Sequence, residues 1–184
     1  MARDDRFPGI RPRVTIGHRL DLAARAAFPS VCTAMAMLLT QAPLGMPGQP
    51  ALLAAVALGC VWFWSVFHPA AMPPPAVFLI GVLQDLLGYL PLGVGVLSLL
   101  LAHGIALRWR RFLGQQGFAL NWLAFAPVAL GAAVLCWVLV GLLRLTLMPP
   151  GLALFQAALT AALYPVLAIP LARAHRSILR SGDA

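Results

Sequence analysis

Long stretches without a single charged side chain are the feature of this sequence that most restricts its fold. Residues 26–84, 86–107, 112–143 and 145–172 contain no Asp, Glu, Lys or Arg. An α-helix rises about 1.5 Å per residue and the hydrocarbon core of a bilayer is about 30 Å thick, so each stretch can cross a membrane. Only 10% of the residues are charged, which is too few to cover a water-soluble domain. The sequence therefore predicts one all-α domain that is a polytopic integral membrane protein.

Turn-forming residues divide the charge-free stretches into about six transmembrane helices. We expect helices at 26–44, 51–67, 75–90, 92–108, 121–147 and 152–172. The division of 76–107 depends on Gly88, Pro91, Gly93 and Gly95, because a single helix of that length is too long for one crossing.

The segments that flank these helices are polar and are expected to form two cytoplasmic tails. The N-terminal tail covers residues 1–25 and the C-terminal tail covers 173–184, on either side of a transmembrane domain at 26–172. Residues 13–28 fit two interpretations equally well. They form either a short amphipathic helix on the membrane surface or a solvated segment.

The distribution of arginine predicts the orientation of the helices. All thirteen basic residues are arginines. With six crossings and a cytoplasmic N-terminus, twelve of them lie on the cytoplasmic side and only Arg144 lies outside, as the positive-inside rule requires. A single helix at 76–107 would place Arg108, Arg110 and Arg111 outside, so the same count supports six crossings. The arginines cluster at the ends of apolar stretches, which favours membrane anchoring over nucleic-acid binding despite the net charge of +8.

Asp85 is the only acidic residue between Asp21 and Asp183. A charge at membrane depth costs about 3 kcal/mol, so such a residue usually has a function and a partner. Asp85 and Arg144 are each expected about one turn from the outer end of an outward-running helix, which predicts an ion pair. Three roles remain open: an internal ion pair that orients helices, a contact with a partner protein, or transport of protons or a ligand. Without the ion pair, Asp85 is expected to face a partner chain or to cap the turn at 88–93.

The polar residues are too few and too scattered to predict an enzyme. Catalysis normally requires at least two polar groups placed together, and no Ser, His and Asp fall at matching depths. His68 and His103 are expected to be hydrogen-bonded near the cytoplasmic interface rather than to bind a metal. Cys32, Cys60 and Cys136 lie inside the apolar stretches and are expected to be buried. We therefore expect no catalytic residues, no metal and no cofactor.

Two tryptophans, Trp62 and Trp64, stand at the end of the second expected helix. Tryptophan is enriched where a membrane helix meets the aqueous interface. Their position at the end of this helix therefore suits the aromatic belt at the membrane surface.

The segment from Trp62 to Gly93 carries a series of short motifs. It reads Trp62-Phe-Trp-Ser-Val-Phe-His68-Pro69 and then, after a triple proline, Gly81-Val-Leu-Gln-Asp85-Leu-Leu-Gly88-Tyr-Leu-Pro91-Leu92-Gly93. This series resembles the signature region of the MreD family of rod shape-determining proteins. That family pairs an aromatic-rich second span ending in Arg-Pro with a Gly-Leu-x-x-Asp segment and a Pro-Leu-Gly turn. The resemblance is sharp over 62–101 and general elsewhere, with His68 where the family usually has Arg and Val82 where Leu is usual.

The resemblance indicates candidate interaction residues. Arg144 is added because it is expected at the same membrane depth as Asp85. The candidates are His68, Pro69, Gly81, Asp85, Gly88, Pro91, Leu92, Gly93 and Arg144.

What the resemblance implies is a membrane subunit of the bacterial cell-elongation complex, placed in the inner membrane, that supports peptidoglycan synthesis and maintains cell shape. Members of the MreD family work with the bitopic protein MreC, with actin-like MreB, and with the glycosyltransferase RodA and its transpeptidase partner. No enzymatic activity is attributed to the family. Its helix arrangement is similar to that of the substrate-binding S-components of energy-coupling-factor vitamin transporters.

That similarity leaves an alternative, which is a membrane subunit that binds a small ligand or a lipid. A ligand-binding subunit would need a polar-lined cavity near the outer side of the membrane. An interaction subunit would instead expose a groove of small or aromatic residues to its partner.

Overall fold

The computed structural model describes residues 16–42, 48–145 and 149–180, with side chains described from residue 27 to residue 173. Within these residues the chain is all-helical, which confirms the predicted fold class. Its six α-helices are α1 (Ile16–Thr40), α2 (Gln49–Phe67), α3 (Pro74–Leu87), α4 (Val94–Leu113), α5 (Phe118–Arg144) and α6 (Gly151–Arg180), and a 3-10 turn η1 (Pro69–Ala71) lies between α2 and α3. The predicted tails at 1–15 and 181–184 lie outside the described residues.

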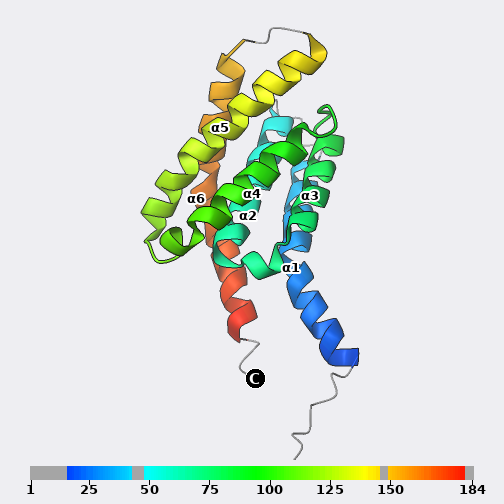
Figure 1. Ribbon diagram of the computed structural model, residues 1–184, viewed down its shortest axis with the longest axis vertical. Coiled ribbons are helices and arrows are strands. Elements are labelled where there is room, and N and C mark those ends of the chain that lie inside the picture. The colour runs from blue at the N-terminus through cyan, green and yellow to red at the C-terminus, as the bar shows by residue number, and fades with distance from the viewer. Residues whose placement is uncertain (1–15, 43–47, 146–148, 181–184) are drawn as a thin grey trace, which may run out of the picture.

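Consecutive helices run in opposite directions, so that their connections alternate between the two ends of the bundle (Figure 1). At one end, the Arg144 guanidinium donates a hydrogen bond to the Tyr89 carbonyl (3.0 Å). Near the same end, the Gln156 amide donates to the Ala51 carbonyl (3.0 Å). We call this the Arg144 end. The opposite end, where α4 finishes, is called the Arg108 end.

Helix α2 lies at the centre of the bundle. It contacts α1, α4 and α6 along its length and is buried almost continuously from Leu53 to Val66. Trp62 and Trp64 are 1% and 0% exposed, so the prediction that they lie at the membrane surface is wrong. They pack instead against rings from other helices, Trp62 on Phe125 of α5 and Trp64 edge-on to Phe28 of α1.

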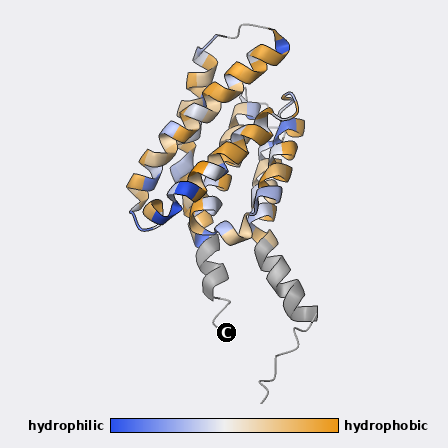
Figure 2. Cartoon of the chain, in the orientation of Figure 1, coloured by the Kyte–Doolittle hydropathy of each residue, from blue (hydrophilic) through white to orange (hydrophobic). Residues whose placement is uncertain are grey.

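Many large apolar side chains of the outer helices are exposed on the surface of the bundle. The ribbons of these helices are coloured largely as hydrophobic in Figure 2. Helix α2, helix α5 and Gly151–Arg173 of α6 are long and apolar enough to cross a membrane, and Ala27–Thr40 and Pro74–Leu87 form shorter apolar helices. An apolar surface of this extent suits lipid and not water. The fold therefore indicates a membrane protein, while six crossings remain a prediction.

Each of the six expected helices has a counterpart in the described residues, but the boundaries differ. The break within 76–107 is confirmed, since α3 ends at Leu87 and α4 begins at Val94. Helix α1 already begins at Ile16 and continues through Pro29, so the surface segment and first span expected separately share one helix. Helices α4 and α6 extend beyond the expected ends at 108 and 172. Arginine marks the edge of the hydrocarbon region and is also favourable in the last turn of a helix, so it does not end the helix.

Candidate functional site: the α3–α4 turn

Asp85 joins the end of α3 to the beginning of α4. The residue is 1% exposed. Its Oδ2 accepts a hydrogen bond from the Gly93 backbone N–H and its Oδ1 accepts one from the Gly95 N–H, each at 2.7 Å. These N–H groups belong to the first turn of α4, where backbone donors have no partner within the helix and where the helix dipole favours negative charge. Asp85 therefore caps α4 from the neighbouring helix.

The predicted ion pair between Asp85 and Arg144 is wrong. No salt bridge joins the two side chains, both of which the structure describes. The Arg144 guanidinium is exposed and binds the Tyr89 carbonyl instead. The backbone of α4 satisfies both carboxylate oxygens, so Asp85 needs no cation. The other arrangement expected from the sequence, in which Asp85 caps the 88–93 turn, is the one observed.

Two glycines permit the close approach of α3 and α4. A Cβ atom at Gly81 would lie 2.5 Å from the Cα atom of Val96 on α4. A Cβ atom at Gly95 would overlap Asp85 Oδ1 and would lie 3.1 Å from Gln84 Nε2. Any larger residue at these positions would push the helices apart or displace the capping carboxylate.

The turn between the helices has a left-handed backbone at two positions. Gly93 has φ 102° and Tyr89 has φ 53°. Gly93 is the N-cap of α4, and glycine adopts this conformation without the steric cost that a side chain incurs. Gly88 is the C-cap of α3, and the Pro91 carbonyl accepts a hydrogen bond from the Val94 N–H (3.3 Å). The glycines and the proline of this motif thus have local structural roles.

The candidate residues fall into two groups. Gly81, Asp85, Gly88, Pro91, Leu92 and Gly93 come together in the α3–α4 hairpin, and Arg144 reaches it through Tyr89. His68 and Pro69 lie apart from it, at the connection between α2 and α3. The backbone N–H of His68 donates to the Trp64 carbonyl (2.7 Å) and Pro69 begins η1. The motif segment therefore contributes to both ends of the bundle.

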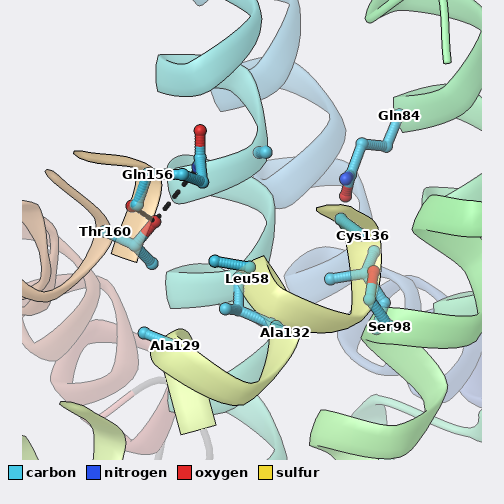
Figure 3. A pocket seen from close by; sticks show the side chains of 11 residues that line it. Leu58, Gln84, Ser98, Ala129, Ala132, Cys136, Gln156 and Thr160 are labelled. Carbon is cyan, nitrogen blue, oxygen red and sulfur yellow. Dashed lines mark hydrogen bonds between the residues drawn. The ribbon is translucent and has the colours of Figure 1, made fainter. Parts of the chain in front are cut away.

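A small cavity inside the bundle is lined by Gln84, the residue that precedes Asp85 in the sequence (Figure 3). The cavity has a volume of about 30 Å³. Its polar lining residues are Gln84, Ser98, Gln156 and Thr160. Gln84 is 2% exposed and its Oε1 has no hydrogen-bond partner within the described residues. None of these four residues carries a charge, so the charge pattern that singles out Asp85 does not reveal them. Uncharged polar residues within the charge-free stretches were the available signal.

A wider pocket opens next to this cavity at the Arg144 end. It encloses about 400 Å³ and is lined by Tyr89, Arg144, Gln156 and apolar side chains of α5 and α6. The pocket and the cavity share Ala133, Cys136 and Gln156 as lining residues. A ligand that entered from this end would therefore meet polar groups near the level of Gln84.

A second buried polar contact connects α2 to α4. Ser65 Oγ and His103 Nδ1 are 2.7 Å apart, and both side chains are buried. The sequence did not predict this pair, although it predicted that His103 would be hydrogen-bonded. His103 lies nearly three turns before the end of α4 on the face that packs against α2. Burial of both groups suits a helix-to-helix contact better than a nucleophile and base that a substrate must reach.

The described residues contain no group of three or more His, Cys, Asp or Glu side chains that could hold a metal ion. No family model matches the chain, and no curated protein and no solved structure is significantly similar to it. The resemblance to the MreD family thus remains a hypothesis based on the motif residues.

Proposed function

We propose that this chain is a non-enzymatic membrane subunit of the bacterial cell-elongation complex, of the MreD kind. In this proposal it crosses the inner membrane six times with both termini in the cytoplasm. It binds MreC and thereby supports peptidoglycan synthesis by RodA and its transpeptidase partner, in coordination with MreB. The proposal rests on the motif resemblance over 62–101 and on the way the α3–α4 turn uses its residues.

The observation that carries the proposal is the use of Asp85. A general base must reach a proton on the substrate, and a metal-binding carboxylate must offer a free oxygen. Both oxygens of Asp85 accept backbone hydrogen bonds, and the residue is 1% exposed. The motif therefore specifies a helix hairpin of defined shape, which favours an interaction role over catalysis.

The exposed residues of this hairpin supply the contact surface in our proposal. Helix α3 lies at one edge of the bundle (Figure 1). Leu79 and Leu86 occupy one face of α3 and are 67% and 60% exposed, and Leu92 in the turn is 70% exposed. Because Leu92 is so exposed, packing within the chain does not explain a leucine at this position. Contact with a partner protein would explain it. The transmembrane helix of MreC is the occupant that the resemblance implies for this face.

Co-purification of MreC tests this interface. Leu79→Trp combined with Leu86→Trp should reduce recovery of MreC about tenfold, equal to a loss of about 1.4 kcal/mol of binding free energy. Leu154→Trp on α6 is the matched control, because Leu154 is equally exposed on a helix far from α3. Equal recovery with both variants would exclude the α3 face.

The cellular role has its own test, which is clean depletion of the chain. Loss of the protein should make rod-shaped cells round, and the Leu79→Trp, Leu86→Trp variant should fail to restore the rod. Cells that keep their shape after depletion would refute the role in elongation.

The pocket at the Arg144 end favours a second candidate function, which is binding of a small ligand. Its volume of about 400 Å³ lies within the range of about 300–1,000 Å³ that is usual for small-molecule sites. The test is mass spectrometry of small molecules released from purified protein on denaturation. A molecule that accompanies the wild type and is lost in Arg144→Gln would support this candidate, and its absence from the wild type would count against it.

A further inference from the structure

An apolar groove lies between α4 and α5 at the Arg108 end of the bundle. It encloses about 360 Å³. Ile105, Trp109 and Phe112 of α4 form one wall, Leu120 and Leu123 of α5 form the other, and Trp62 lies at its base. The Trp62 indole N–H already donates to Asn121 Oδ1 (3.2 Å). The groove therefore offers surface for an apolar chain and no free hydrogen-bonding group at its base.

Three arginines stand at the end of this groove. Arg108, Arg110 and Arg111 are exposed in the last turns of α4, where hydrophilic residues gather in Figure 2. No hydrogen bond or ion pair joins their guanidinium groups to other described residues. The sequence contains no acidic residue between Asp85, at the other end of α4, and Asp183. The positive charge at the groove is thus uncompensated within this part of the chain.

Helix geometry places the charge beside the groove. Ile105, Trp109 and Phe112 follow one another at the spacing of a single helix face. Arg108 lies three residues after Ile105 and four before Phe112, so it borders that face directly. The guanidinium group forms paired hydrogen bonds with phosphate oxygens, and its planar fork suits that geometry better than a lysine does.

We propose that this groove binds an anionic phospholipid, with one acyl chain between α4 and α5 and the phosphate against Arg108 and its neighbours. The acyl chain of such a lipid matches the apolar walls of the groove, and its anionic headgroup matches the three arginines at the end of the groove. A partner helix would fill the apolar half but would leave the three arginines without acceptors. This inference does not depend on the proposed function.

Lipid retention by the purified full-length chain tests the proposal. The protein is exchanged into detergent, mixed with phosphatidylglycerol or with phosphatidylcholine of the same acyl chains, and examined by native mass spectrometry and thermal unfolding. Phosphatidylglycerol should remain bound and raise the unfolding temperature, whereas phosphatidylcholine should do neither. Equal behaviour of the two lipids would overturn the proposal, and so would a groove occupied by a co-purifying protein instead of lipid.

Arginine variants distinguish a specific headgroup site from general electrostatic attraction between the protein and anionic lipid. Replacing Arg108, Arg110 and Arg111 by Gln should lower phosphatidylglycerol retention at least tenfold. Arg173→Gln, which removes an exposed arginine from α6, should leave retention unchanged. An equal loss with Arg173→Gln would show diffuse electrostatic attraction and refute a specific site.

The apolar half has its own variant and readout. Phosphatidylglycerol with brominated acyl chains should quench part of the tryptophan fluorescence. Trp109→Phe should reduce that part, and the remainder should come from Trp62 at the base of the groove. Ala124→Leu adds bulk to the groove wall with the arginines intact, and it should reduce both quenching and retention. Quenching that is as strong in Trp109→Phe and in Ala124→Leu as in the wild type would place the acyl chain elsewhere on the molecule.

Discussion

Asp85 is a buried carboxylate whose partners are backbone N–H groups and not a cation. This arrangement removes two unpaired donors from the first turn of α4 and at the same time solvates the carboxylate. Replacement by asparagine leaves one carbonyl oxygen to accept, so the N–H group of either Gly93 or Gly95 loses its partner. An unpaired buried donor is costly because the membrane interior offers no water.

We therefore expect Asp85→Asn to lower the free energy of unfolding by about 1.5–3 kcal/mol. Arg144→Gln removes one exposed hydrogen bond to the Tyr89 carbonyl and should cost less than about 1 kcal/mol. Reversible unfolding in mixed micelles measures both changes.

The double variant decides between the observed arrangement and an ion pair. Because the two side chains do not touch, their effects should add to within about 0.5 kcal/mol. A coupling energy above about 1 kcal/mol would mean that the charges do interact.

Gly95 and Gly104 form a matched pair within α4. Alanine at Gly95 would displace the Asp85 carboxylate, whereas a Cβ atom at Gly104 meets nothing within 4 Å. Gly95→Ala should cost about 2 kcal/mol or more in unfolding free energy. Gly104→Ala should stabilise the protein by up to about 1 kcal/mol, since alanine favours the helix. Similar effects of the two substitutions would exclude the close contact at Gly95.

Sequence reasoning identified Asp85 but assigned it the wrong partner. Depth along a helix can be counted from the sequence, and the count placed Asp85 and Arg144 at the same end of the bundle. The direction in which a side chain points around the helix axis depends on how the helices pack. Counting residues from the end of a helix gives no information about that packing. Asp85 points towards α4, while Arg144 stays on the outside of the turn.

At the scale of helices, α3 and α4 cross at close range. A Cβ atom added to a glycine at this crossing would lie nearer to the other helix than one added at any other described glycine would lie to its neighbours. A Cβ atom at Gly81 would meet the backbone of Val96, which cannot move without the helix. At Gly59, where α2 meets α6, the nearest atom is Leu167 Cδ1 at 3.0 Å, the end of a side chain that can rotate.

Gly81→Ala should therefore cost about 1–3 kcal/mol and Gly59→Ala less than about 1 kcal/mol. Thermal unfolding in detergent provides the measurement. A larger effect at Gly59 would mean that α2 and α6 are more rigidly packed than α3 and α4.

Helix positions were more predictable than helix contacts. Breaks such as the one after Leu87 follow from glycine and proline, whose backbone preferences act locally. The burial of Trp62 and Trp64, and the Ser65–His103 contact, depend on α2 being enclosed by other helices. That enclosure involves residues far apart in sequence, so a local pattern did not reveal it.

At the scale of the whole molecule, the alternating helices place the described arginines unequally. Arg108, Arg110, Arg111 and Arg173 lie at ends of helices that share one side of the bundle, and Arg144 lies on the other. Six crossings with both termini in the cytoplasm follow if this arrangement obeys the positive-inside rule.

Reporter fusions test this orientation. Alkaline phosphatase should be active when fused in the loop after Arg144 and inactive when fused after Gln116 or at the C-terminus. An active C-terminal fusion would contradict the six-crossing topology.

The shortness of α3 has a consequence for the bilayer itself. Its 14 residues extend about 21 Å along the helix axis, against a hydrocarbon thickness of about 30 Å. In the proposed six-crossing arrangement, lipids beside α3 would compress to match it, at a cost of a fraction of a kcal/mol for each ångström of mismatch. A neighbouring protein that covers this face would remove the compressed lipid. Elastic strain in the membrane would then add to the attraction between the two chains, even where their side chains make few specific contacts.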